Sequence, residues 1–170
     1  SLLSDFVSWS FPAFKLRWLV NEFRLNLPLE LDFQHEAKNS ERSARNFADD
    51  PLVICPRVVR CTKRVLVMEF IHGFPVNRLD RLAPHGIRPA QVASLLTDCF
   101  CRQIFRHGFV HSDPHPGNVY VRPVTDAAER KRLGSPFQLV LLDHGLYREL
   151  GQLFRIDYAH LWLALIERDD

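Results

Sequence analysis

The sequence contains little that would mark a membrane-spanning, nucleic-acid-binding or zinc-binding protein. None of its apolar runs approaches the ~18 residues that a helix needs to span a bilayer. Its net charge of +2 is too small to favour a nucleic-acid partner, because such proteins usually present a clustered basic face. Its 4 cysteines show neither C-x-x-C pairs nor zinc-ligand spacing, so we expect reduced thiols. The length of 170 residues, with 46% hydrophobic and 25% charged residues, suits one globular domain.

One stretch, residues 110–121, carries the strongest functional signal. It reads V-H-S-D-P-H-P-G-N-V-Y-V and places His111, Asp113 and Asn118 at relative positions one, three and eight. This is the spacing of the H-x-D-x-x-x-x-N loop of kinase-like phosphotransferases, where the Asp orients an attacking hydroxyl and the Asn binds Mg²⁺. The prolines and glycine between them predict a rigid, sharply turning loop. We expect His111 to pack and hydrogen-bond rather than to carry a proton.

A second metal ligand follows an apolar run. Residues 138–142 (Q-L-V-L-L) are typical of a buried strand, and they lead directly into D-H-G at residues 143–145. In kinases, the Asp of D-F-G at such a strand end binds the Mg²⁺ that bridges the nucleotide phosphates. We expect a strand at 119–122 to pair with 138–142 as a hairpin. Asn118 and Asp143 would then lie near each other as the metal ligands.

The histidines leave one other chemistry open. A transition metal could instead be ligated by a set drawn from both motifs, namely His111, Asp113, His115, Asp143 and His144. That hydrolase hypothesis would leave the spacing to Asn118 and the strand-borne D-x-G unexplained.

The rest of the chain predicts an α+β fold. Helical periodicity favours helices at 11–25, from Pro28 to about residue 47, at 89–106 and at 151–166. The second of these carries the stripe Phe33, Ala37, Ser40, Ala44 and Phe47. Glu36 lies beside that stripe and can face inward.

Two short β runs, at 57–60 and 64–70, precede a linker that contains Gly73. Kinase lobes are joined by a strand followed by such a linker. If this is such a junction, the backbone at Met68, Glu69 and Phe70 would meet the adenine edge of a nucleotide. A plain hairpin would show the same pattern.

Four stretches together resemble the UbiB/AarF-domain (ADCK) atypical kinase-like family. They are L-E-L-D-F-Q-H-E-A at 29–37, R-V-L-V-M-E-F at 64–70, F-V-H-S-D-P-H-P-G-N-V at 109–119 and L-L-D-H-G-L-Y at 141–147. The resemblance covers nearly the whole chain. The use of D-H-G rather than D-F-G resembles a eukaryotic, mitochondrial branch of the family.

The resemblance implies a protein kinase-like fold. Approximately residues 1–70 would form part of the N-lobe, with an αC-type helix and hinge strands, and 74–170 the front half of the helical C-lobe. Asp113 would be the catalytic-loop Asp, with Asn118 and Asp143 as metal ligands.

Three acidic residues acquire roles from the same resemblance. Glu36 would pair with an ATP-binding Lys. Glu30 and Asp32 match an E-x-D motif that meets a K-x-G-Q motif in an upstream extension.

The resemblance also implies ATP and Mg²⁺ as cofactors, nucleotide as a partner and a mitochondrial location. The family is associated with ATP hydrolysis, coenzyme Q synthesis and mitochondrial lipid homeostasis. A lipid or quinone precursor is thus an expected substrate, and peripheral membrane contact is expected through segments outside this chain.

Some parts of the family pattern are missing from the sequence. There is no Gly- or Ala-rich nucleotide loop and no K-x-G-Q, and none of the lysines lies in a convincing V-A-x-K strand. We therefore expect the chain to be a fragment whose missing parts precede Ser1, and to be inactive by itself.

Two alternatives remain for the function. Small-molecule kinases of the aminoglycoside and choline kinase type use a similar loop. A nucleotide-binding scaffold without turnover is the other alternative, although such a module has no need of the Asp113 side chain.

Overall fold

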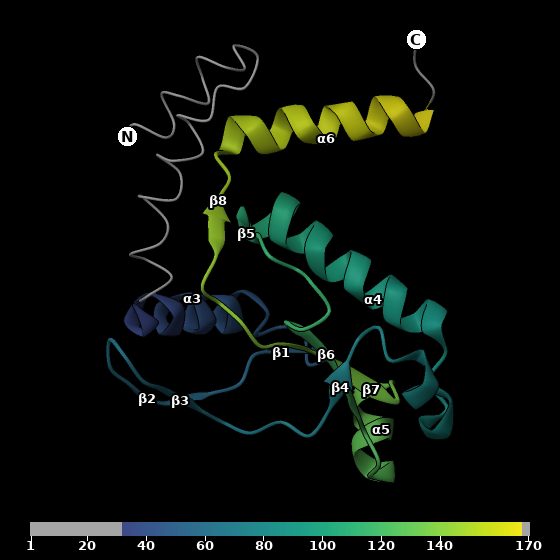
Figure 1. Ribbon diagram of the computed structural model, residues 1–170. Coiled ribbons are helices and arrows are strands. Elements are labelled where there is room, and N and C mark those ends of the chain that lie inside the picture. The colour runs from purple at the N-terminus through teal and green to yellow at the C-terminus, as the bar shows by residue number, and fades with distance from the viewer. Residues whose placement is uncertain (1–31, 168–170) are drawn as a thin grey trace, which may run out of the picture.

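The computed structural model describes residues 32–167, and the helix expected at 11–25 lies outside these residues. Helices and strands alternate irregularly along the chain in an α+β arrangement (Figure 1). In chain order the elements are α3 (Phe33–Asn46), β1 (Val53–Ile54), β2 (Val58–Cys61), β3 (Leu66–Met68), β4 (Phe74–Pro75), η1 (Leu79–Arg81), η2 (Ala83–His85), α4 (Pro89–Cys101), η3 (Arg102–His107), β5 (Phe109–His111), β6 (Val119–Pro123), α5 (Ala127–Leu133), β7 (Phe137–Leu141), β8 (Tyr147–Glu149) and α6 (Gln152–Glu167).

A four-stranded sheet of order β1-β7-β6-β4 forms the centre of the described fold. The predicted hairpin is present: β6 pairs antiparallel with β7, in a register that runs from Val119 opposite Leu141 to Pro123 opposite Phe137. Each of the five residues of β7 is buried, which matches the uninterrupted apolar run in the sequence. β1 completes the pairing of β7 on its other edge, in parallel.

The connection between β6 and β7 contains a helix that the sequence analysis missed. The sequence analysis placed no helix between the strands at 119–122 and 138–142, but α5 lies there. Asp126 caps α5 by accepting a hydrogen bond from the Glu129 backbone N–H at 2.7 Å, and Gly134 ends it in the left-handed conformation with φ 65°.

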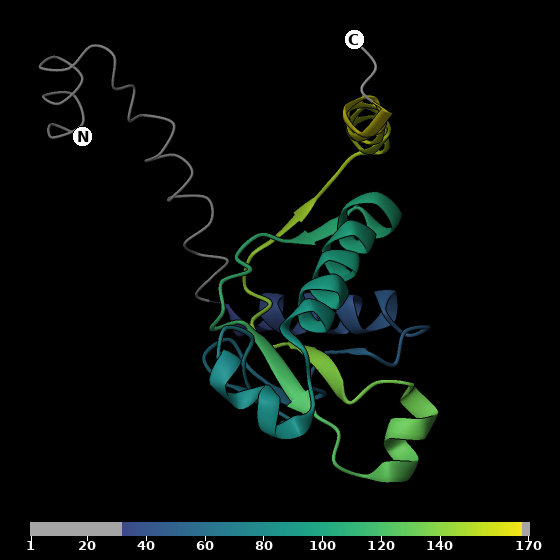
Figure 2. The same ribbon diagram turned by 90° about the vertical axis from the view of Figure 1, so that its right-hand side faces the viewer.

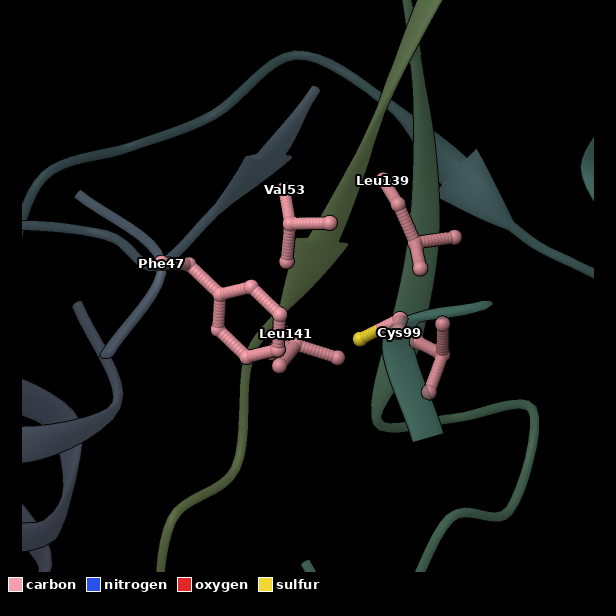
Figure 3. Packing of buried hydrophobic residues seen from close by; sticks show 6 residues of the cluster. Phe47, Val53, Cys99, Leu139 and Leu141 are labelled. Carbon is pink, nitrogen blue, oxygen red and sulfur yellow. The ribbon is translucent and has the colours of Figure 1, made fainter. Parts of the chain in front are cut away.

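The main core lies between one face of the sheet and α4. Its buried members come from five elements or their flanks, and Figure 3 shows five of them converging: Phe47, Val53, Cys99, Leu139 and Leu141. The helix expected at 89–106 is present as α4 followed by the wider turns of η3. Gly108 closes it with φ 59°, where an added Cβ would lie 2.9 Å from the Leu150 carbonyl oxygen.

α3 begins later than the sequence suggested. Its first helical residue is Phe33, and Asp32 precedes it as the N-cap, accepting a hydrogen bond from the Gln34 backbone N–H at 3.0 Å. The α3 N-terminus contacts the β2–β3 hairpin, since the Phe33 N–H donates to the Lys63 carbonyl at 3.3 Å. Of the predicted apolar stripe, Ala44 is exposed, while the polar residues Asn39 and Ser43 are buried.

The last helix, α6, projects away from the sheet in both ribbon views (Figures 1 and 2). It contacts η3 through Tyr158, whose ring stacks on Phe105 at 5.8 Å, and through Arg155, whose guanidinium donates to the Phe105 carbonyl at 3.2 Å. Trp162 of the same helix is 46% exposed. Within residues 32–167, no helix has the length and apolar character that crossing a bilayer would require.

The central strand offers a direct test of the core. Leu139→Ala should lower the free energy of unfolding by about 3 kcal/mol, because Leu139 is 0% exposed and its neighbours cannot fully collapse into the cavity. Leu79→Ala is the matched control, since Leu79 is 58% exposed and the change should cost less than about 0.5 kcal/mol. Urea denaturation measures both, and equal losses would contradict the assigned core.

Candidate active site

The loop between β5 and β6 is folded around Asn118. This side chain is 7% exposed, and its Nδ2 donates to the Asp113 backbone carbonyl at 3.0 Å and to Asp113 Oδ2 at 3.5 Å. The Asp113 side chain is 53% exposed and faces the solvent side of the loop. Because the amide nitrogen of Asn118 is engaged, its side-chain oxygen is the atom left for a ligand.

A second turn in the same loop requires glycine. An added Cβ at Gly117 would lie 2.5 Å from Cε1 of His115, because the imidazole folds back over the chain. His115 Nδ1 accepts a hydrogen bond from the Gly117 N–H at 2.9 Å, and its Nε2 lies 3.7 Å from Asp113 Oδ2. His115 thus orients the loop beside the Asp113 carboxylate.

The hairpin register brings Asp143 to this loop. The Leu142 N–H donates to the Asn118 carbonyl at 2.9 Å, which extends the β6–β7 pairing by one residue. Asp143 therefore leaves the sheet next to Asn118. Its Oδ1 accepts a hydrogen bond from the Gly145 N–H at 2.8 Å, which forms a tight turn through the D-H-G tripeptide.

Three carboxylates from separate elements line one cavity of about 330 Å³. They are Glu36 of α3, Asp113 of the loop and Asp143 after β7; Phe33, Gly145 and Leu146 complete the lining. The sequence-predicted acids, about 100 residues apart in the chain, are thus brought together.

Electrostatic repulsion acts within this cavity. Burial raises the pKa of Glu36, and the negative charge of Asp143 raises this pKa further. The His144 N–H donates to Glu36 Oε1 at 3.5 Å and partly opposes the increase in the pKa. The causes of the pKa shift of Glu36 include no cationic side chain of residues 32–167.

The middle residue of D-H-G is a buried, neutral histidine. His144 is 1% exposed, and burial lowers its pKa to about 4. Both of its ring nitrogens are hydrogen-bonded, Nε2 to the Leu141 carbonyl at 3.0 Å and Nδ1 to the Tyr147 hydroxyl at 3.0 Å. The described part of the chain contains no group of three or more His, Cys, Asp or Glu arranged to hold a metal ion. Because both ring nitrogens of His144 are hydrogen-bonded within the protein, neither is open to a transition metal, and this argues against the transition-metal hypothesis.

His111 is buried behind the loop. It is 2% exposed, burial lowers its pKa, and its ring stacks on Tyr147 at 5.2 Å. Its backbone N–H donates to Oε1 of Gln103 at 2.7 Å, and its Nδ1 accepts from the Asp113 N–H at 3.3 Å. These contacts hold the start of the loop from inside the protein.

Sequence reasoning missed the polar residues that support D-H-G. They are Asn39 and Ser43 on α3 and Tyr147 at the start of β8. Gln103 of η3, which was also missed, holds the backbone of His111. The spacing of Asn39 and Ser43 from Glu36 would have shown that all three share one helix face.

The remaining predicted residues do not join the carboxylates. Glu69 and Phe70 line a separate cavity of about 820 Å³ behind Gly73, and it shares no residue with the cavity of Asp113 and Asp143. Met68 lines neither cavity. Glu30 lies outside the described residues, and Asp32 serves as the α3 N-cap.

Kinase-like phosphotransferases combine an H-x-D loop that ends in an Asn with a strand-borne Asp and a helix Glu. Here the three acids line one cavity, and the Asn is hydrogen-bonded to the loop Asp. The sequence matches the family model of the ABC1 atypical kinase-like domain over residues 1–170. The chain belongs to this family. The predicted family and the predicted α+β kinase-like fold are both confirmed.

Several relatives carry related names. The chain is 42% identical to AarF domain-containing kinase 1 of Drosophila melanogaster, covering 94% of this chain and 30% of the relative. It is 44% identical to AarF domain-containing protein kinase 1 of Xenopus tropicalis, covering 94% of this chain and 29% of that one. The chain therefore spans about 30% of the length of these relatives.

One solved structure supports the fold. The Rv3197–erythromycin complex from Mycobacterium tuberculosis is similar with a TM-score of 0.60 and 25% identity. The match covers 82% of this chain and 32% of that one.

The raised pKa of Glu36 predicts a specific dependence of stability on pH. Stability from the protonated carboxyl is fully present below the unfolded-state pKa, and it is lost as the pH rises through the higher folded-state pKa. Glu36→Gln removes the charge but keeps an acceptor for His144. In metal- and nucleotide-free protein at pH 7, this change should raise Tm and flatten the fall in stability across that pH window. Glu41→Gln, on the exposed face of the same helix, is the control. A lower Tm for Glu36→Gln would contradict the repulsion.

Proposed function

We propose that the whole protein is an ATP- and Mg²⁺-dependent phosphotransferase or ATPase whose phosphate-side residues lie in this chain. The observation that carries the proposal is the cavity shared by Glu36, Asp113 and Asp143, with Asn118 folded against Asp113 at its edge. No structural role requires three carboxylates to line one cavity, and the repulsion between Glu36 and Asp143 is unfavourable until cations enter.

The donor set fits Mg²⁺. This ion prefers oxygen ligands from a small number of carboxylate and amide groups and retains several waters. Asp143 uses Oδ1 for the Gly145 amide, which leaves Oδ2 available, and Asn118 retains its side-chain oxygen. Bound Mg²⁺ would neutralise part of the charge on the nucleotide phosphates.

The other residues take roles from their positions. Asp113 is exposed to solvent and its backbone is held by His111 and Asn118, so its carboxylate can orient a hydroxyl or water and accept its proton. Glu36 would orient the ammonium group of a nucleotide-binding Lys. That cation would also relieve the repulsion that raises the pKa of Glu36.

For the phosphoacceptor we propose a hydroxyl-bearing lipid or quinone precursor, and for the location the mitochondrion. Both proposals rest on the sequence resemblance. A comparison of turnover with such lipids and turnover with small amino-alcohols separates the proposed phosphoacceptor from the small-molecule kinase alternative. The Mycobacterium tuberculosis structure is a complex with erythromycin, so a macrolide belongs in the same comparison.

The decisive variant is Asp143→Asn in the whole protein. Mg²⁺-dependent ATP turnover should fall about 100-fold or more, because several kcal/mol of charge stabilisation would be lost. The stability of the fold should not decrease, since the variant also removes the repulsion between Asp143 and Glu36. Phosphate release measures turnover, and Asp157→Asn on the exposed side of α6 is the control.

Undiminished turnover in Asp143→Asn would refute the metal role of this residue. Nucleotide-dependent thermal stabilisation of the wild type without any phosphate release would instead favour the scaffold alternative.

A further inference from the structure

One face of α3 is polar yet turned toward the protein. Glu36, Asn39 and Ser43 follow each other at intervals of three and four residues, which places them on the same side of the helix. Asn39 and Ser43 are 8% and 1% exposed. A buried polar face is unfavourable unless each group finds a partner.

Each of these groups has a partner in the segment from D-H-G to β8, which crosses α3 (Figure 1). Asn39 Nδ2 also lies 3.3 Å from His35 Nδ1 within α3. Glu36 Oε1 accepts from the His144 N–H at 3.5 Å, and Asn39 Nδ2 donates to the His144 carbonyl at 2.9 Å. One helical turn further on, the hydroxyls of Ser43 and Tyr147 are hydrogen-bonded at 3.4 Å. α3 therefore holds both the backbone of the tripeptide and the side chain of Tyr147.

The hydrogen bonds through His144 have a defined direction. The Leu141 carbonyl can only accept, so His144 Nε2 carries the proton and Nδ1 presents a lone pair. Tyr147 must then donate its hydroxyl proton to Nδ1, and the Ser43 hydroxyl lies 3.4 Å from the same Tyr147 oxygen. The result is a continuous series of hydrogen bonds from α3 through Tyr147 and His144 to the end of β7.

The ring of Tyr147 is held by aromatic neighbours. It stacks on Phe109 at 4.4 Å with an interplanar angle of 22° and on His111 at 5.2 Å with an angle of 12°. It also stacks on His144 at 5.6 Å with an angle of 15°. These contacts leave the hydroxyl little freedom, so it can fix the orientation of the His144 ring.

We propose that Tyr147 is a positioning residue for Asp143: its hydroxyl, held by Ser43, fixes His144 and thereby the turn that directs the Asp143 carboxylate into the cavity. These hydrogen bonds couple the position of α3, which carries Glu36, to the position of the metal-binding carboxylate. The inference deepens the proposed function and rests on it only for the identity of the bound ion.

The first test needs neither metal nor nucleotide. Tyr147→Phe keeps the stacked ring but leaves His144 Nδ1 as a buried acceptor without a donor. In hydrogen–deuterium exchange on the apo protein, the amides of His144 and Gly145 should exchange at least about ten-fold faster than in the wild type, because the turn opens more often. The amides of β6 and β7 should keep their exchange rates.

Two further variants frame this measurement. Ser43→Ala removes the hydroxyl that contacts Tyr147, and it should accelerate exchange at the same two amides. Tyr158→Phe removes a tyrosine hydroxyl of α6, whose ring stacks on Phe105 of η3, and should leave them unchanged. Unchanged exchange at His144 and Gly145 in Tyr147→Phe would overturn the proposal, as would an equal acceleration across the whole sheet.

The second test asks whether the positioning serves the metal. In the whole protein, the Mg²⁺ concentration for half-maximal ATP-dependent thermal stabilisation should rise about 10- to 100-fold in Tyr147→Phe, the usual effect of losing a residue that orients a metal ligand. An unchanged Mg²⁺ midpoint beside accelerated exchange would reduce Tyr147 to a structural residue and refute the proposal. If the wild type shows no Mg²⁺ effect, the proposed function fails, and the exchange data alone decide whether Tyr147 fixes the turn.

Discussion

The antiparallel register of β6 and β7 is the constraint on which the site depends. A shift of one residue would move every side chain of a strand to the opposite face of the sheet. Such a shift is strongly disfavoured here, because β7 is buried along its whole length and pairs with β1 on one edge and β6 on the other. Asn118 and Asp143 therefore take their positions from the hydrophobic core, although neither belongs to it.

The charges of the site are arranged against stability. Glu36 and Asp143 line the same small cavity, and burial, together with repulsion from Asp143, raises the pKa of Glu36. A fold selected only for stability would place an apolar or neutral residue at one of these positions. Local conflicts of this kind are expected where binding requires them, and here cations would resolve the conflict. The electrostatics and the hairpin geometry thus lead independently to the same cavity.

The features that the sequence predicts well are those encoded locally. The apolar run at 138–142 indicates a strand, and the structure has it at Phe137–Leu141; the prolines and glycine after Asp113 indicate the loop. The inward face of α3 was predicted less well, because periodicity arguments assume that buried residues are apolar. Asn39 and Ser43 are buried against partners more than 100 residues later. Their spacing from Glu36 places all three on one helix face, but it does not show that this polar face is buried. α5 was missed because a short, highly charged helix resembles a loop in composition.

The histidine in D-H-G explains why these distant polar residues belong together. An imidazole buried at this depth loses its hydration, and this loss is offset only if both ring nitrogens find partners. One partner, the Leu141 carbonyl, is supplied by the strand itself. The other must be a side-chain donor, and Tyr147 can fill this role only because Ser43 and the aromatic stack hold its ring in place. A phenylalanine at position 144 would need none of these groups, so His144, Tyr147 and Ser43 form one structural unit that links α3 to the metal-side carboxylate.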